Sequence, residues 1–464
     1  MGSYLNPGNR KFAMNTNAKI YVDKTGLIDY CNGVINTPQR SVCMSRPRRF
    51  GKSVTANMLA AYYSRNCDSK GLFQSYEIAG RSGYLEHLNC YHVIFLNMQE
   101  FLSESRNMDS MLKLLKKSVL WELLDAYPDF RYFDETNLTR TMQDIYNKTG
   151  IPFVVIIDEW DCIFREYKID AESQKKYLDF LRDLLKDKVY IALGYMTGIL
   201  PIKKYGTHSA LNMFDEFSMT FAGPLASYVG FTEKEVMELC QRFHMDFDEM
   251  KMWYDGYDMK NAGPLYNPRS VVSAMQFQVC DTYWNQTETF EALRVYIDMN
   301  FDGLKDDIIR MMSGKRVSIQ TGSFTNDMTT FHGKDDVLTL LIHLGYLAYD
   351  FSEKQVYIPN WEVMNEYANA VRVSQWGEVS KALTVSRSIL DAIWNQEEES
   401  VAHAVEQAHI ETSHLQYNDE NALSYTISLA LYAARDYYTV YRELPTGKGF
   451  ADMVYIPRKQ HGEC

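Results

Sequence analysis

The chain has 464 residues, of which 46% are apolar and 23% charged, and its formal net charge is −12. This composition excludes a largely disordered chain, and the acidic balance argues against a basic surface for non-specific nucleic-acid binding. The eight cysteines form no Cys-x-x-Cys pair, which excludes a disulfide scaffold or a zinc finger and predicts a cytoplasmic setting. No apolar run has the length of a membrane-spanning helix, so we expect no membrane segment.

Short apolar segments alternate with helical segments over the first 230 residues. Strands are predicted at 40–45, 93–97, 153–157, 189–196 and 217–221, and helices at 53–64, 108–126 and 173–186. This alternation is typical of an α/β fold with a doubly wound, mainly parallel sheet covered by helices on both faces.

After Gly230 the sequence becomes rich in helices. Thr232 followed by Glu235 has the spacing of a capping box and predicts a helix at 232–243. Residues 335–349 predict a helix leading into a strand at 355–359, compatible with a lid or winged-helix unit. Beyond a polar stretch at 376–387, a long helix, a helix at 421–435 and strands at 438–443 and 452–456 are expected. We therefore predict a core at 1–231, a helical lid or winged-helix-like region at 232–375, and a further α/β segment at 388–464.

A basic loop joins the first predicted strand to its helix and reads Ser45-Arg46-Pro47-Arg48-Arg49-Phe50-Gly51-Lys52-Ser53. It ends in the Gly-Lys-Ser of a Walker A loop, although Arg46 stands where that pattern has its first glycine. In such a loop backbone N–H groups and the lysine bind phosphates, and the hydroxyl ligates Mg²⁺. Arg46, Pro47, Arg48, Arg49, Phe50, Gly51, Lys52 and Ser53 are thus candidate ATP-binding residues, with Lys52 also catalytic and Ser53 a Mg²⁺ ligand. An ordinary helix start with a solvated lysine is the alternative for Gly-Lys-Ser alone.

Two acids directly follow the buried strand at 153–157, as in a Walker B motif. Asp158 is the candidate Mg²⁺ ligand, and Glu159 the candidate general base for an attacking water. The next strand along the chain ends at Thr197, whose hydroxyl is a candidate sensor of the γ-phosphate or an ordinary strand terminus. A strand and helix intervene between the loop and the acids, which favours ATP hydrolysis over phosphoryl transfer to a small acceptor.

An aromatic group, Trp253-Tyr254-Asp255-Gly256-Tyr257, follows in the helix-rich part. Gly256 predicts a turn between helices. We expect Trp253 and Tyr257 to pack in the core rather than to stack on nucleic-acid bases.

With these motifs placed, the chain resembles the AAA-ATPase-like family of bacterial proteins that carry a C-terminal PD-(D/E)XK nuclease-type domain. The resembling stretches lie at 21–25, 46–53, 157–161, 197–199, 230–232, 253–257 and 266–268. The Arg-Pro-Arg-Arg-Phe-Gly-Lys form is characteristic of that family, so the resemblance accounts for Arg46. It implies an ATP-binding P-loop core followed by a lid or winged-helix region.

The resemblance continues at 418–421 and 442–452, where it implies a degenerate nuclease site at Glu420 and Asp452. The Glu-x-Lys motif that such nucleases need does not follow Ile456. We therefore expect an incomplete nuclease domain whose sheet edge is open to association. A nucleic-acid or protein partner would act through this region, and an oligomer is compatible with it.

These observations lead to a Mg²⁺-dependent ATPase as the first hypothesis. A binding module that holds ATP with negligible hydrolysis is the second, and a metal-dependent nuclease the third.

Overall fold

The computed structural model describes residues 2–202, 211–260, 262–284, 290–299, 301–326, 328–374, 376–413, 427–447 and 449–458. The chain divides into two compact units. Unit 1 comprises Met1–Asp281 and Ile319–Gln355, and unit 2 comprises Thr282–Ser318 and Val356–Cys464. The division into parts at 1–231, 232–375 and 388–464 stays a prediction.

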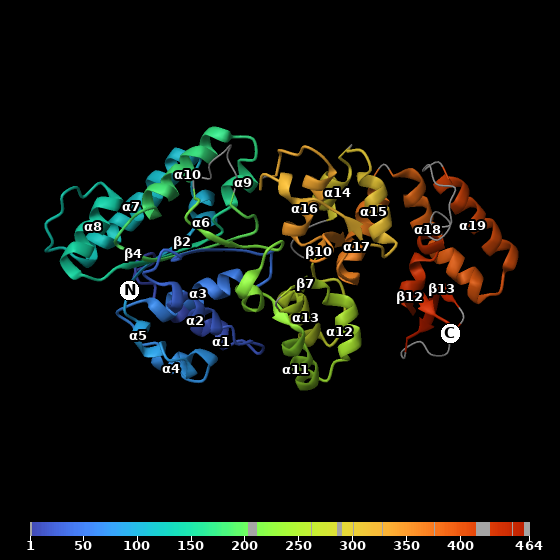
Figure 1. Cartoon of the computed structure of the whole chain (residues 1–464), viewed down its shortest axis with the longest axis horizontal. Coiled ribbons are helices and arrows are strands. Elements are labelled where there is room, and N and C mark those ends of the chain that lie inside the picture. The colour runs from blue at the N-terminus through green and yellow to red at the C-terminus, as the bar shows by residue number, and fades with distance from the viewer. Residues whose placement is uncertain are drawn as a thin grey trace. The chain divides into compact units, whose positions relative to one another are not determined.

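Unit 1 is built on a five-stranded sheet of order β2-β3-β4-β1-β5, in which every pairing is parallel. Its strands are β1 (Ser41–Ser45), β2 (His92–Asn97), β3 (Phe153–Asp158), β4 (Ile191–Gly198) and β5 (Asp215–Phe217). Strands β1, β3 and β4 are buried along their whole length. Helices α7 and α10 lie on one side of the sheet and α2 and α3 on the other (Figure 1). The predicted α/β class with a parallel sheet is therefore confirmed.

Strand β4 lies between β1 and β3, and this order decides which chain segments meet. Ser45 pairs with Gly198 at the end of β1, and Ile157 pairs with Met196 near the end of β3. Strand β2, which intervenes in sequence, lies instead at the edge of the sheet. The carboxyl ends of β1, β4 and β3 thus share the edge at which parallel sheets bind ligands.

Ten helices are described before β5. They are α1 (Arg10–Thr16), α2 (Gly26–Val34), α3 (Lys52–Tyr63), α4 (Lys70–Phe73), α5 (Tyr84–His87), α6 (Met98–Ser103), α7 (Met108–Ala126), α8 (Leu138–Thr149), α9 (Cys162–Glu166) and α10 (Ala171–Leu185).

The start of the chain covers the free edge of β2. Leu5 forms an antiparallel bridge with Ile94 of that strand. The Glu122 carboxylate of α7 accepts the backbone N–H groups of Ser3, Tyr4 and Leu5 at 2.8, 2.9 and 2.7 Å. These contacts protect an edge that would otherwise offer unpaired backbone groups.

The rest of unit 1 contains a second sheet and several helices. Strands β6 (Phe231–Thr232), β8 (Gly263–Tyr266) and β7 (Tyr257–Met259) pair antiparallel in that order. The other elements are α11 (Glu233–Phe243), α12 (Phe247–Tyr254), α13 (Pro268–Phe277), α16 (Lys334–Leu344) and β10 (Ala348–Asp350). The predicted capping box is confirmed, since Thr232 N–H donates to Glu235 at 2.7 Å and the Thr232 hydroxyl accepts from Glu235 N–H at 3.4 Å.

The aromatic group around Gly256 packs largely as expected. Tyr254 and Tyr257 are buried, and the Tyr257 hydroxyl donates to the Gly345 carbonyl at 2.6 Å. Trp253 is half-buried. Gly256 has a φ of 110°, which favours glycine, but its turn joins α12 to strand β7 rather than to a helix.

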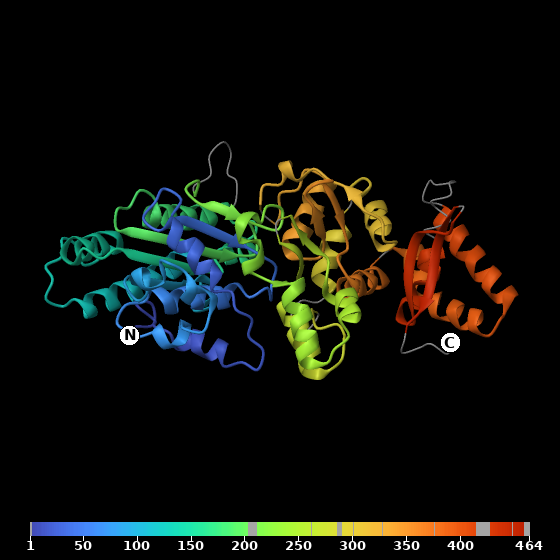
Figure 2. The same cartoon turned by 60° about the horizontal axis from the view of Figure 1, so that its bottom comes forward.

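Unit 2 contains helices and a hairpin. The elements are α14 (Phe290–Ile297), α15 (Leu304–Met312), β9 (Val317–Ser318), α17 (Trp361–Val373), α18 (Gly377–Trp394), α19 (Glu398–Ser413), β12 (Tyr438–Pro445) and β13 (Phe450–Pro457). The unit boundary passes through β11 (Gln355–Tyr357). In Figure 2, β12 and β13 lie side by side as the antiparallel hairpin. Among the described residues, no helix is long and apolar enough to cross a membrane.

Only one of the two predicted degenerate nuclease residues lies among the described residues. Asp452 lies on β13, and Glu420 lies outside the described residues. Most of the helix predicted at 421–435 also lies outside them, and the part that is described forms a helical turn at 427–430 and a 3₁₀-helix at Tyr432–Asp436. The nuclease-type domain stays a prediction.

Candidate functional site

The loop that follows β1 turns sharply into α3. Arg49 and Gly51 both have left-handed backbone conformations, with φ of 69° and 96°. Gly51 is the N-cap residue of α3, a twelve-residue helix that begins at Lys52. The first turn of a helix leaves backbone N–H groups without intrahelical partners and carries a partial positive charge. The loop thus ends in a helix start of the kind that binds anions.

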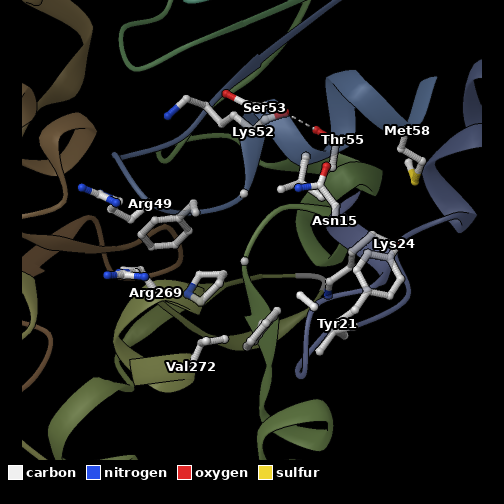
Figure 3. A pocket seen from close by; sticks show the side chains of 18 of the residues that line it. Asn15, Tyr21, Lys24, Arg49, Lys52, Ser53, Thr55, Met58, Arg269 and Val272 are labelled. Atoms are coloured by element: carbon white, nitrogen blue, oxygen red, sulfur yellow. Dashed lines mark hydrogen bonds between the residues drawn. The ribbon is translucent and has the colours of Figure 1, made fainter. Parts of the chain in front are cut away.

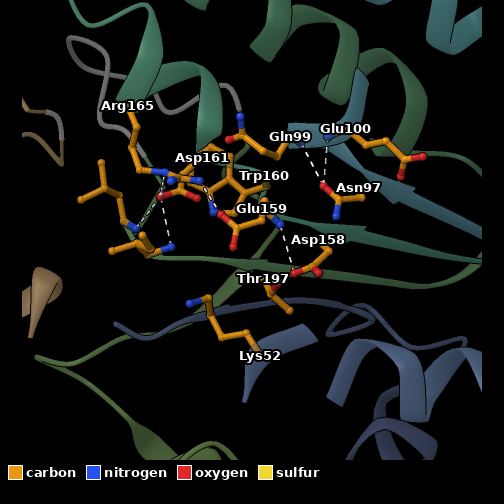
Figure 4. Close-up of polar contacts among 12 residues, drawn as sticks. Lys52, Asn97, Gln99, Glu100, Asp158, Glu159, Trp160, Asp161, Arg165 and Thr197 are labelled. Carbon is orange, nitrogen blue, oxygen red and sulfur yellow. Dashed lines mark hydrogen bonds and ion pairs between the residues drawn. The ribbon is translucent and has the colours of Figure 1, made fainter. Parts of the chain in front are cut away.

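Lys52 is buried at this helix start. Its ammonium donates to the carbonyl oxygens of Arg46 and Pro47 at 3.0 and 2.9 Å. Burial lowers the pKa of Lys52, while the negative charges of Glu159, Asp161 and Asp158 oppose that effect. The lysine therefore lies between its own loop and the acids that follow β3 (Figure 4).

Arg46 lies beneath the loop. Its side chain is fully buried, and Nη1 donates to the carbonyls of Ser45 and Phe217 at 2.9 and 3.2 Å. Within the described part of the chain, its Nε and Nη2 have no hydrogen-bond partner. Burial lowers the pKa of Arg46 to about 10. Where a Walker A loop has its first glycine, this chain has an arginine that links the loop to the end of β5 by a hydrogen bond.

The acidic pair follows β3 as predicted. Asp158 is buried, and its Oδ1 accepts the Thr197 hydroxyl and, at 3.1 Å, the N–H of Glu159 (Figure 4). Thr197 lies on β4, directly beside β3 in the sheet. The threonine hydroxyl therefore fixes the orientation of the Asp158 carboxylate. Its role toward the γ-phosphate stays a prediction.

Glu159 adopts a left-handed backbone conformation with a φ of 54° and forms an ion pair with Arg165 of α9. The Nε of Arg165 lies 3.5 Å from Oδ2 of Asp161. That oxygen also accepts the N–H groups of Ile199 and Leu200 at 3.0 and 2.9 Å. Burial opposes the charge on Arg165, but the carboxylates of Asp161 and Glu159 outweigh burial and raise its pKa.

Neither Arg165 nor Asp161 was among the residues that the sequence assigned to the site. Asp161 falls within a family-like stretch, and its four-residue spacing from Arg165 was the available signal for the ion pair.

A cavity of about 620 Å³ opens beside the loop (Figure 3). Residues 48–53 and Glu159 line it, whereas the side chains of Arg46 and Pro47 do not. The remaining walls come from α1 and the segment after it, from α3, and from residues 228–231 and 268–272. They include Met14, Ala18, Ile20, Tyr21, Val22, Met58, Tyr228, Phe231, Pro268 and Val272. The cavity therefore joins a cationic end to a largely apolar one, which also contains Asn15 and Lys24, and it has the size of a small-ligand site.

Arg269, near the start of α13, also lines this cavity. Figure 3 shows its guanidinium close to that of Arg49. Burial lowers the pKa of Arg49, and the positive charges of Arg269 and Arg48 lower it further. The family-like stretch at 266–268 ends one residue before Arg269, so the sequence reasoning missed this cation.

The side chains at the site can be compared with the ligands that Mg²⁺ requires. Within the described residues, no group of three or more His, Cys, Asp or Glu side chains is placed to hold a metal ion. Mg²⁺ needs fewer protein ligands beside a polyphosphate, because it keeps water and phosphate oxygens in its octahedron. The Ser53 hydroxyl at the cavity and the Asp158 carboxylate at the end of β3 are oxygen donors of the required kind, so the donor chemistry fits this ion; Asp158 itself does not line the cavity.

The sheet order, the Gly-Lys-Ser loop after β1 and the Asp-Glu pair at the end of β3 define a P-loop NTPase type of fold. The model of the AAA-ATPase-like family, described as a predicted AAA-ATPase, matches residues 9–207. That range contains the loop, the acidic pair and Thr197, and it does not reach the predicted nuclease-type segment.

An uncharacterized protein in the vnfD 5′ region of Azotobacter chroococcum mcd 1 is 23% identical over 275 residues. The match covers 58% of this chain and 51% of that protein, so it spans about half the length of the relative.

Two solved structures show limited similarity. The Aeropyrum pernix ORC2 protein, solved as ADPNP-ADP complexes, is 12% identical, with a TM-score of 0.33, and the match covers 79% of this chain and 98% of that one. The Aeropyrum pernix ORC1 protein in complex with DNA is 10% identical, with a TM-score of 0.27 and coverage of 100% and 96%.

Proposed function

We propose that the protein binds ATP in this cavity and hydrolyses it with Mg²⁺. The observation that carries the proposal is the composition of one cavity wall. That wall combines Lys52, Ser53 and Glu159, and it lies at the carboxyl edge of the sheet. A cation, a hydroxyl at a helix start and a carboxylate are the groups that phosphoryl transfer to water requires.

The two ends of the cavity fit the two ends of a nucleotide. The triphosphate would lie over the start of α3, where Arg49 and Arg269 add positive charge. The base would enter the apolar end, against Tyr21 and Met58. An aromatic ring and a thioether give a base contact area without demanding a charge.

The chain's own groups would divide the chemistry as follows. Lys52 would exchange its two carbonyl acceptors for phosphate oxygens. Asp158, oriented by Thr197, and Ser53 would hold the Mg²⁺ ion, which neutralises phosphate charge when bound. Glu159 would accept a proton from the attacking water.

Two substitutions test this proposal. Lys52→Ala should abolish turnover and weaken ATP binding at least about tenfold, because a charged phosphate contact is lost. Glu159→Gln should retain ATP binding while turnover falls roughly 10²-fold or more. Isothermal titration and phosphate release measure the two quantities, and the exposed Lys148→Ala serves as the matched lysine control. Undiminished hydrolysis in both site variants would refute the proposal.

A binding module with negligible hydrolysis is the second candidate. It is favoured by the contacts of Lys52 with its own loop, because ATP must displace both carbonyls before the lysine binds phosphate. A single-turnover assay with purified protein separates the candidates. Stable ATP on the wild-type protein would identify the module, and Glu159-dependent ADP formation would identify the ATPase.

A further inference from the structure

The strongest polar network outside the predicted site residues lies behind Glu159. The network includes Asp161, whose side chain is fully buried. Its Oδ2 accepts two backbone N–H groups from the segment that follows β4. These two backbone hydrogen bonds orient the carboxylate through Oδ2, while its buried Oδ1 has no hydrogen-bond partner among the described residues. Asp161 is therefore a fixed anchor and lies outside the cavity wall.

Arg165 connects this anchor to Glu159. Its side chain is 9% exposed, and its Nη2 donates a hydrogen bond to Oε2 of Glu159. Its Nε lies 3.5 Å from Oδ2 of Asp161 as an ion pair and has no hydrogen-bond partner among the described residues. The guanidinium is a planar fork whose donors keep fixed relative directions. Because the group is rigid, its ion pair with Asp161 limits where Nη2, and with it the Glu159 carboxylate, can lie.

Glu159 itself is the part of the network that reaches the cavity. Its side chain is 25% exposed, and its residue lines the cavity beside the phosphate loop. Its left-handed backbone, with a φ of 54°, is unfavourable for a non-glycine residue and persists only where neighbouring contacts hold it. The pair with Arg165 is such a contact (Figure 4).

We propose that Arg165 is a positioning residue that holds the Glu159 carboxylate at the cavity wall, in the orientation needed to accept a proton from water. The inference rests on the proposed ATPase function. Through Asp161, the same network joins the end of β3 to the segment after Thr197. Both groups expected to face the γ-phosphate are thereby held relative to one another before ATP arrives. Such preorganisation is worth large factors in rate, since a misplacement of about 1 Å can cost roughly 10²-fold.

The test is Arg165→Ala in the full chain, with kcat and KM for ATP measured separately. The kcat should fall about 10- to 100-fold, while KM stays within about twofold, because Arg165 contacts the general base Glu159 and does not contact the nucleotide. Arg165→Lys should recover part of kcat, since an ammonium keeps the charge but cannot reproduce the fork. Arg182→Ala, which removes a surface ion pair with Asp179 on α10, is the matched control.

A double variant distinguishes a positioning role of Arg165 from a general structural effect of its removal. In Glu159→Gln, where the base is already lost, adding Arg165→Ala should cause no further fall in kcat and no change in ATP affinity. If Arg165→Ala does not fold, Arg165→Lys and Asp161→Asn decide the question. Both should lower kcat at unchanged KM.

A wild-type or higher kcat in these variants would overturn the role of Arg165 and leave Glu159-dependent hydrolysis standing. Turnover that depends on neither Lys52 nor Glu159 would instead overturn the proposed function itself.

Discussion

Glu366, on α17 of unit 2, gives a quantitative prediction about stability. Its side chain is 1% exposed, and neither carboxylate oxygen has a hydrogen-bond partner within the part of the chain that the structure describes. Burial without a partner disfavours the charged form and raises the pKa of Glu366 to about 7 from an ordinary value of 4.5. The folded protein therefore holds this proton at pH values where the unfolded chain has released it.

The sign and size of the effect follow from linkage. Between pH 4.5 and 7 the folded state binds more protons than the unfolded state, so the free energy of unfolding falls as pH rises. The stabilisation is fully present below the unfolded pKa and is lost once pH passes the folded pKa. At about 1.4 kcal/mol for each pKa unit, the loss is roughly 3 kcal/mol, and above about pH 8 no further change is expected from this group.

The assay compares urea unfolding of the wild-type protein and Glu366→Gln at pH 5 and pH 8, followed through the transition that includes α17. Glutamine has nearly the same shape and cannot ionise, so the variant should lose less stability on going to pH 8, by about 3 kcal/mol. The exposed Glu399→Gln on α19 should behave like the wild type. An identical pH dependence of the wild type and Glu366→Gln would refute the reasoning.

Two further substitutions test the site. Arg269→Ala removes a cation from the cavity and should weaken ATP binding about 3- to 10-fold, with little effect on adenosine binding. Titration with both ligands measures the two affinities. Equal losses of affinity for ATP and adenosine would contradict a contact between Arg269 and phosphate. Gly198→Ala places a Cβ 2.5 Å from Nε1 of Trp160 and 2.8 Å from Oδ1 of Asp161, and this overpacking should cost about 1–3 kcal/mol in urea unfolding. Gly33→Ala, whose Cβ would meet nothing within 4 Å, is its control, and equal stability of the two variants would show that the end of β4 relaxes freely.

The central strands could be predicted because their sequence pattern has one physical cause. A strand buried on both faces needs a continuous apolar run, and 153–157 is such a run. At the ends of strands, and for the short edge strand β5, the same reasoning loses accuracy. The strand predicted from Val189 begins at Ile191, and the strand predicted at 217–221 lies at Asp215–Phe217, so the two share only Phe217. Val189 and Phe221 are 66% and 59% exposed, so their apolar character does not report burial.

Short helices were missed for a different reason. Helices α4, α5 and α9 have four or five residues each. Isolated helices of that length are unstable, so contacts with the rest of the fold determine them and local periodicity does not. Arg165 lies on one of these helices. Its position beside Glu159 therefore depended on structure that the sequence pattern could not specify.

The basic cluster around the loop shows where charge counting along a sequence stops being informative. Sequence reasoning groups Arg46 with the phosphate-binding residues, but its guanidinium donates to backbone carbonyls. Arg40, just before β1, likewise donates to the Lys188 carbonyl at 3.1 Å. Lys52 and Arg49 line the cavity, and Arg269 joins them from more than 200 positions away. Whether an arginine bonds to backbone carbonyls or is available to bind an anion depends on which acceptors the fold places beside it. A phosphate in this cavity would thus meet a cationic wall assembled from two distant segments: Arg48, Arg49 and Lys52 of the basic loop, and Arg269 of α13.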